Sequence, residues 1–274
     1  MSARRNARGR KRRPRVWRWI IFALTAVYFL VPLGAAAEFS LRQADSRYGL
    51  ANYAEIARDP ALRDSLTSSL QIALATIVIT LVLMVPTVVY VRLRLPRLSL
   101  LLEGVTVLPI VIPPVVMAAG MAFMQANFTD ATSQWLFSSP LTALTPFYVI
   151  LALPFTYRSL DAGLRAIDLQ TLVEAARNLG AGWWTVLGRV ILPNIRTAVL
   201  GAAFLTLALV LGEVVIARIL LYVTFPVQVV ETGQTSAGVS VALSLASLVL
   251  TWVLLLVLSF AGGRGRRRLV GGIA

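Results

Sequence analysis

The sequence predicts an all-α membrane protein with six transmembrane helices and one long water-facing connection between the fourth and fifth. Hydrophobic residues make up 58% of its 274 residues and charged residues only 14%. In a soluble domain about half of the residues are hydrophobic and roughly a quarter are charged. The hydrophobic residues are gathered into six blocks, and the basic residues are concentrated on alternate connections. Together these features indicate a single domain that spans a membrane.

Each of the six blocks is about as long as a helix needs to cross roughly 30 Å of hydrocarbon. The blocks are residues 17–37, 69–91, 104–124, 141–157, 197–217 and 239–262, of which the fourth is the shortest. The first block resembles a secretory signal peptide, because basic residues precede it and small residues follow it. Its apolar run is longer than the usual signal core, and Trp17 and Trp19 flank it, so we expect an uncleaved helix. Pro109, Pro113 and Pro114 should break or kink the third.

The basic residues indicate the orientation. If both termini are cytoplasmic, 21 of the 26 Lys and Arg residues face inward, which agrees with the positive-inside rule. The inward residues lie in the tails 1–16 and 264–274 and the connections 92–103 and 158–196, together with Arg18 at the edge of the first block. We expect one transmembrane domain over residues 17–263, and tails that contact anionic lipid and not nucleic acid.

Several kinds of chemistry lack the residues that they require. There is no cysteine and no histidine, which removes thiolate chemistry, the commonest metal ligand and the commonest general base. The sequence also contains no Gly-x-x-x-x-Gly-Lys-[Ser/Thr] loop, which would hold nucleotide phosphates. We therefore expect no catalytic residue, no metal site and no cofactor in this chain.

The inward connection 158–196 contains a short capped helix. Asp168 is a good N-cap and Gly180 a good left-handed residue at the C-terminal end, so we expect a helix over about 169–179. Its apolar face should contain Leu169, Leu172, Val173, Ala176 and Leu179. A second short helix should begin at the WWTVLGRVI sequence and stop at Pro193. A helix of this length is only marginally stable alone in water, so it needs something to pack against. Because its polar side has few basic residues, we expect that surface to be a protein partner rather than lipid headgroups.

The stretch EAARNLGAGWWTVLGRVILP resembles the EAA loop found in permease subunits of binding-protein-dependent ABC importers. The positions that match are Glu174, Ala175, Ala176, Gly180, Leu192 and Pro193, while Val190 stands where isoleucine is usual. The resemblance extends over about residues 50–260 and includes the proline-rich LPIVIPPVVMAAGM sequence in the third block. It is nearest to permeases of the polyamine, ferric-iron and phosphonate or sulfate type.

This resemblance implies a type I importer permease whose loop acts as a coupling helix on a separate ATPase. It implies an ATPase-coupling site made of Glu174, Ala175, Ala176, Arg177, Gly180, Leu192 and Pro193. The partners implied are two ATP-binding ATPase subunits, a second permease subunit that is identical or homologous, and an extracytoplasmic substrate-binding protein. The implied location is the bacterial inner membrane, with both termini cytoplasmic.

One acid lies well inside a predicted transmembrane helix. An ionisable group at that depth indicates either function or a paired structural role. Glu213 is expected to share a helical face with Ala202 and Thr206, and Arg218 is a candidate partner for it. Ser244 belongs to a polar stripe on the last block. We take Glu213, Thr206 and Ser244 as possible pathway residues, with close helix packing as the alternative.

The expected substrate is a small polar or cationic solute such as a polyamine, because a cation suits an acid in the pathway. Ferric iron, phosphonate and sulfate-type anions are the alternatives within the same class. A stand-alone secondary transporter is a second hypothesis, weakened by the lack of internal repeats and of further buried charges. A membrane-embedded hydrolase is a third, and the catalytic residues that it needs are missing.

Overall fold

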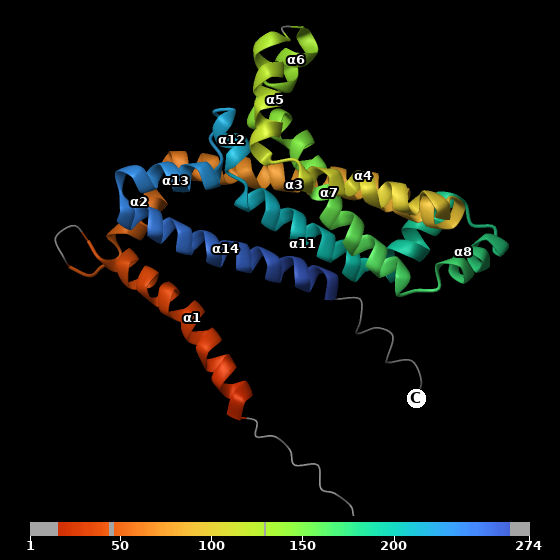
Figure 1. The fold of residues 1–274 in the computed structure, drawn as a ribbon, viewed down its shortest axis with the longest axis horizontal. Helices are drawn as coiled ribbons and strands as arrows, with labels where there is room; N and C mark the ends of the chain where they lie inside the picture. Colours follow the sequence, from red (N-terminus) through yellow and green to blue (C-terminus); the bar gives the residue numbers. More distant parts are fainter. Residues whose placement is uncertain (1–15, 44–46, 129, 264–274) are drawn as a thin grey trace, which may run out of the picture.

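The chain is described by a computed structural model over residues 16–43, 47–128 and 130–263, and the secondary-structure elements in these ranges are helices (Figure 1). The two predicted basic tails lie outside the described residues, except for residue 16, which begins the first helix. Helices rich in apolar residues run the length of the molecule, and short helices close its two ends. The predicted all-α membrane fold is confirmed.

Five helices are long and apolar enough to cross a membrane unaided, when the one that begins at Arg196 is counted across a short break to Ile219. They are α1 (Val16–Leu41), α3 (Pro60–Arg94), α7 (Pro140–Arg165), α11 (Arg196–Gly212) and α14 (Ala237–Gly263). Each covers one predicted block. Helix α7 is longer than expected because its last two turns carry charged side chains that form ion pairs at the end of the bundle.

The third predicted block is not a straight helix. It forms α4 (Ser99–Val111) and α5 (Pro114–Asn127), which meet at an angle of 85°. Two consecutive prolines at the junction have no backbone N–H, so the α-helical hydrogen bonds cannot continue there. If this bent pair is counted as one span, the described residues give the predicted total of six. In Figure 1, α5 and the short α6 (Ala131–Leu136) project from the bundle.

The fifth block is also interrupted. Helix α11 ends at Gly212, and the chain resumes helical structure as α12 (Val215–Ile219). Glu213 lies in the break, with an extended backbone. We expected Ala202, Thr206 and Glu213 to share one helical face. That expectation is wrong for Glu213, because α11 ends one residue before it.

The core is built on α7, which packs against α3 on one side and α11 on the other. Helices α7 and α11 approach most closely where their residues are small. A Cβ atom added at Gly163 of α7 would lie 2.3 Å from the Cβ of Ala198 on α11. One turn away, the Ser159 hydroxyl donates a 2.7 Å hydrogen bond to the Ala198 carbonyl. Small residues and interhelical hydrogen bonds of this kind stabilise helix packing inside membranes.

The opposite end of the bundle from α8 (Leu169–Asn178) is closed by α2 (Ala51–Arg58) and α13 (Phe225–Thr235) (Figure 1). The junction of α2 and α3 is a sharp break between two helices. Asp59 ends α2 and caps α3 by accepting a hydrogen bond from the Ala61 amide, and Pro60 begins α3. Helix α1 contacts α14 and α2, its N-terminal end extends away from the bundle (Figure 1), and none of its apolar window is buried by the rest of the chain.

Candidate functional site

The candidate site is the connection between α7 and α11, which begins with the capped helix α8. The Asp168 carboxylate accepts hydrogen bonds from the hydroxyl (2.8 Å) and the backbone amide (3.3 Å) of Thr171. The hydroxyl bond is the main reason that the pKa of Asp168 is lowered from its ordinary value, and the amide bond adds to it. The predicted cap at Asp168 is confirmed, and α8 matches the expected helix to within one residue.

Helix α8 ends in a sharp reversal at Gly180. This glycine has φ of +81°, in the left-handed region that glycine adopts without a Cβ clash. Its amide donates to the carbonyl of Arg177 at 2.9 Å, and the Ala181 amide donates to the carbonyl of Ala176 at 3.0 Å. These two bonds form a Schellman motif. The left-handed glycine expected from the sequence is therefore present, and it turns the chain back beneath α8.

The second half of the connection is a helix of mixed geometry. It consists of α9 (Trp183–Thr185), the π-helical segment η2 (Val186–Ile191) and α10 (Leu192–Asn194). It ends at Asn194, one residue beyond the stop expected at Pro193. Its apolar residues, including Ile191, are buried in the same cluster as the inner face of α8, so the whole connection is fixed to the ends of α3 and α7.

Helix α8 has an inner and an outer face. Leu169 and Val173 are 8% exposed, and Ala176 packs against the core beside them. Leu179, expected on this apolar face, is instead 89% exposed. That expectation was wrong because α8 ends at Asn178. Leu179 belongs to the turn that Gly180 completes, so its side chain points outward. Leu179 is the most exposed large apolar side chain that the structure describes.

The residues singled out as a coupling site fall into two groups. Ala175, Glu174, Gly180 and Pro193 are exposed, whereas Ala176 and Leu192 are partly buried against the core. Glu174 accepts a 3.0 Å hydrogen bond from the side chain of Gln170. Arg177 is exposed but lines a hollow together with Arg94 and Trp183, towards the bundle. The outer face of α8 is thus Thr171, Ala175, Asn178 and Leu179, and we call these four residues the docking face.

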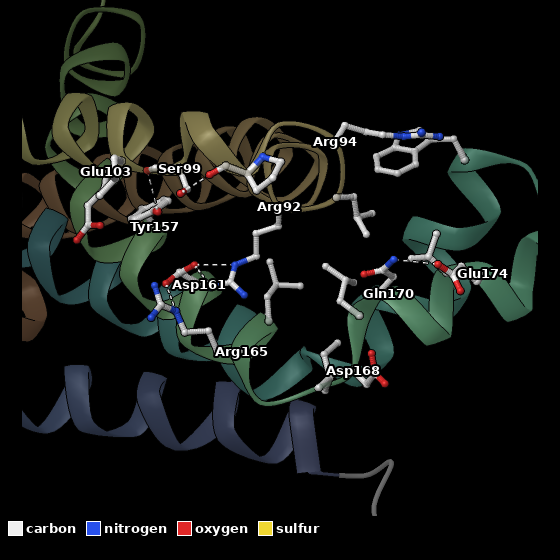
Figure 2. Close-up of a pocket in the computed structure, with 18 of the residues that line it drawn as sticks. Arg92, Arg94, Ser99, Glu103, Tyr157, Asp161, Arg165, Asp168, Gln170 and Glu174 are labelled. Carbon is white, nitrogen blue, oxygen red and sulfur yellow. Dashed lines mark hydrogen bonds and ion pairs between the residues drawn. The ribbon is translucent and has the colours of Figure 1, made fainter.

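A cavity of about 730 Å³ separates α8 from the ends of α3, α4 and α7 (Figure 2). At its centre Arg92 donates two hydrogen bonds to one carboxylate oxygen of Asp161, at 2.8 and 2.6 Å. Arg165 donates to the other oxygen at 2.8 Å. This charge cluster was not foreseen, because Arg92 is 69 residues from Asp161 and only the packing of α3 on α7 brings them together. It ties the end of α3 to the turn that leads into α8.

The three possible pathway residues are not brought together. Glu213 is half-buried, and its two carboxylate oxygens accept from the Tyr148 hydroxyl (2.8 Å) and the Ile216 amide (3.0 Å). Thr206 is buried, and Ser244 is exposed and donates to Ser240 of its own helix. No hydrogen bond joins the three within the part of the chain that the structure describes. Tyr148, and not Arg218, is the side-chain partner of Glu213.

These features define a polytopic membrane protein with a rigid helical connection at one end of its bundle. Its family is shown by sequence: the family described as "Binding-protein-dependent transport system inner membrane component" matches residues 73–270. The chain belongs to this family of ABC importer permeases, as the resemblance of its EAA loop had indicated.

Individual relatives agree with this assignment. The chain is 31% identical over 219 residues to the probable ABC transporter permease protein y4fN of Sinorhizobium fredii, covering 73% of this chain but only 37% of that relative. It is 30% identical over 213 residues to the putative 2-aminoethylphosphonate transport system permease protein PhnU of Salmonella typhimurium, covering 73% and 74% of the two chains. The chain thus spans little more than a third of the length of the first relative.

The fold has a solved counterpart. A chain in the crystal structure of a bacterial alginate ABC transporter, in complex with an alginate pentasaccharide-bound periplasmic protein, superposes with a TM-score of 0.64. The match covers 94% of this chain and 99% of that one, at 17% sequence identity. At this identity the similarity concerns the fold alone.

Proposed function

We propose that this chain forms half of a solute pathway in an ABC importer and receives its driving energy through the docking face of α8. The observation that carries this proposal is Leu179, which is 89% exposed on a helix whose inner face is firmly packed. A large apolar side chain fixed at the tip of a capped helix is costly to leave in water. A groove on a separate ATPase subunit is the partner that suits it.

The shape of the docking face supports this partner. Ala175 lies one turn before Leu179, so a helix end with one small and one large apolar residue can enter a narrow groove. The Schellman turn at Gly180 and the buried η2 segment hold this end in place. The face therefore enters the complex already ordered, which reduces the entropy lost on binding.

The inner face of α8 supplies the route for transmission. Leu169 and Val173 belong to the same buried cluster as Val88 of α3 and Leu160 of α7. Packed clusters of this kind move as units and do not deform continuously. A displacement of α8 by an ATPase would consequently shift the ends of α3 and α7, which form the centre of the bundle.

The remaining partners follow from the same scheme. Half a pathway requires a second permease subunit, and ATP is bound by the ATPase pair and not by this chain. The α2 end of the bundle faces the substrate-binding protein, and the α8 end faces the cytoplasm, as the distribution of basic residues indicates. We therefore propose an inner-membrane location with both termini inside.

The substrate class proposed is a small polar solute that carries an alkylammonium group. The relative named for 2-aminoethylphosphonate supports a solute of that size, and a polyamine, the original expectation, shares its ammonium group. Glu213 is the acid that could attract such a group. Its two hydrogen bonds within the chain also suit a structural role. Comparing the uptake rates of 2-aminoethylphosphonate, a polyamine and sulfate decides which class of solute is transported.

The experiment is co-purification of the tagged full-length chain from its native membranes. An ABC-type ATPase should accompany the wild-type chain, and L179R should lose it because a charge is placed at the centre of the docking face. E174R and G180R should weaken the association as well. The matched control is L221R, since Leu221 is 87% exposed but lies between α12 and α13, far from α8. Retention of the ATPase by L179R would refute the proposed docking face.

A further inference from the structure

We propose that the groove between the last turns of α3 and the start of α9 binds one anionic phospholipid. Two adjoining hollows form this groove, one cationic and one mostly apolar, and both are lined by Tyr90 and Trp183. Their chemistry changes along α3 in the same order as that of a phospholipid, from acyl chain to phosphate. This proposal concerns the permease chain itself and does not depend on the ATPase.

The cationic hollow has a volume of about 400 Å³ and is lined by Tyr90, Arg94, Arg177 and Trp183. Neither guanidinium group forms an ion pair or a hydrogen bond with any described residue, and no acid lines this hollow. Two guanidinium groups from different elements can together hold a phosphate by several charge-assisted hydrogen bonds. The chemistry of this hollow therefore suits an anion.

The neighbouring arginines make the contrast clear. Arg92, two residues before Arg94, is bound to Asp161, which also accepts from Arg165. In Figure 2 the Arg94 side chain extends away from this cluster, towards the connection that carries α8. The bundle thus neutralises one pair of arginines with its own carboxylate and leaves the other pair for a ligand.

The apolar hollow has a volume of about 300 Å³ and is lined by Pro86, Thr87, Tyr90, Val91 and Trp183. Four-residue steps along a helix stay on one face, so Pro86, Tyr90 and Arg94 form a single stripe on α3. This stripe is about 12 Å long at 1.5 Å per residue. Its apolar end lies inside the span that we predicted to finish at residue 91, and its charged end lies just beyond.

Tyr90 and Trp183 mark the boundary between the two halves. Their rings meet edge to face, with centroids 6.2 Å apart and planes at 90°. Tyrosine and tryptophan favour the depth of the lipid headgroups, where one end of the ring is apolar and the other is wet. A phosphate at Arg94 and Arg177 is therefore at headgroup depth, and the acyl chain follows α3 into the hydrocarbon.

The net charge of the hollow selects among lipids. Two unpaired arginines favour phosphatidylglycerol, which carries a net negative charge, over phosphatidylcholine, whose choline group brings a compensating cation. A lipid held there joins the end of α3 to α8 through Arg94 and Arg177. It also gives Arg177 a role on the inner side of α8, distinct from the docking face.

The test is native mass spectrometry of the delipidated full-length chain, titrated separately with dioleoyl-phosphatidylglycerol and dioleoyl-phosphatidylcholine. The wild-type chain should retain one phosphatidylglycerol about tenfold more strongly than phosphatidylcholine, and the double variant R94Q/R177Q should lose that preference. The matched control is R97Q/R189Q, which removes two exposed arginines that line neither hollow. It should keep the preference, and thermal unfolding should show both variants folded.

Two further arms distinguish a lipid from a soluble anion. Deacylated glycerophosphoglycerol and inorganic phosphate should bind much more weakly than the lipid and should not displace it, because they cannot occupy the apolar hollow. Equal retention of phosphatidylglycerol by R94Q/R177Q and the wild-type chain would overturn the proposal. Displacement of the lipid by millimolar phosphate would overturn it as well, in favour of a soluble anion site.

Discussion

Arg92 at the end of α3 and Asp161 on α7 are 69 residues apart in sequence and joined by two hydrogen bonds, of 2.8 and 2.6 Å, to the same carboxylate oxygen. Asp161 is only 14% exposed, and its other oxygen is bound by Arg165. One carboxylate therefore neutralises two guanidinium groups at the end of the bundle. This contact joins the first and second halves of the chain directly beside the connection that leads to α8.

Replacing Asp161 by asparagine should destabilise this end of the bundle. The amide leaves two arginines close together without a counter-charge, at an expected cost of about 1–3 kcal/mol. The measurement is the thermal unfolding midpoint of D161N in detergent. E103Q is the matched control, because Glu103 lines the same cavity and its carboxylate forms no hydrogen bond or ion pair with another described residue. Equal midpoints for the two variants would show that the cluster contributes nothing to stability.

Replacing Gly163 by alanine should separate α7 from α11. The new Cβ would lie 2.3 Å from that of Ala198, which belongs to a packed helix and has no flexible end to move. Overpacking of this kind costs about 1–3 kcal/mol. G120A in α5 is the control, since no atom lies within 4 Å of the added Cβ there. Folded yield and unfolding midpoint should fall for G163A alone; a normal yield of G163A would contradict the close contact.

Replacing Gly180 by alanine should strain the turn after α8. Alanine at φ of +81° costs about 1–2 kcal/mol, although open space surrounds the position. Gly182 is the ideal comparison, because it is also open but has φ of −73°. We expect G180A to weaken ATPase association and G182A to leave it unchanged. If both variants associate equally well, the turn is not what orders the docking face.

Glu213 and Tyr148 allow the two roles of this half-buried acid to be separated. If Glu213 mainly holds the break after α11, E213Q should preserve uptake because the amide can still bond to Tyr148 and Ile216, while E213A and Y148F should lower the unfolding midpoint. If it attracts a cationic substrate, E213Q should lose uptake at an unchanged midpoint. Transport assays beside thermal unfolding of the three variants decide between these outcomes.

Local signals in the sequence predicted much of the fold and part of the site. The cap at Asp168 and the turn at Gly180 depend on a few adjacent residues, so their chemistry is readable directly. The break at Pro113 is of the same kind. Leu179 was misplaced because helical spacing was continued one residue too far, past the point where the turn begins.

Features that depend on tertiary packing could not be predicted. The Arg92–Asp161 pair requires the alignment of α3 and α7, and the contact of Gly163 with Ala198 requires that of α7 and α11. No proline in the sequence indicates the break at Glu213. Its hydrogen bond from Tyr148, far away in the sequence, satisfies the carboxylate there, and no local pattern contains that information.

The central claim, that Leu179 lies in the interface with an ATPase, is tested most directly by cysteine labelling, because the native chain contains no cysteine. In inside-out membrane vesicles, L179C should react quickly with a membrane-impermeant maleimide when the ATPase has been stripped and slowly when it is restored. L221C should not react in either case. Labelling of L179C at the same rate with and without the ATPase, or labelling only from the outer side, would contradict the account.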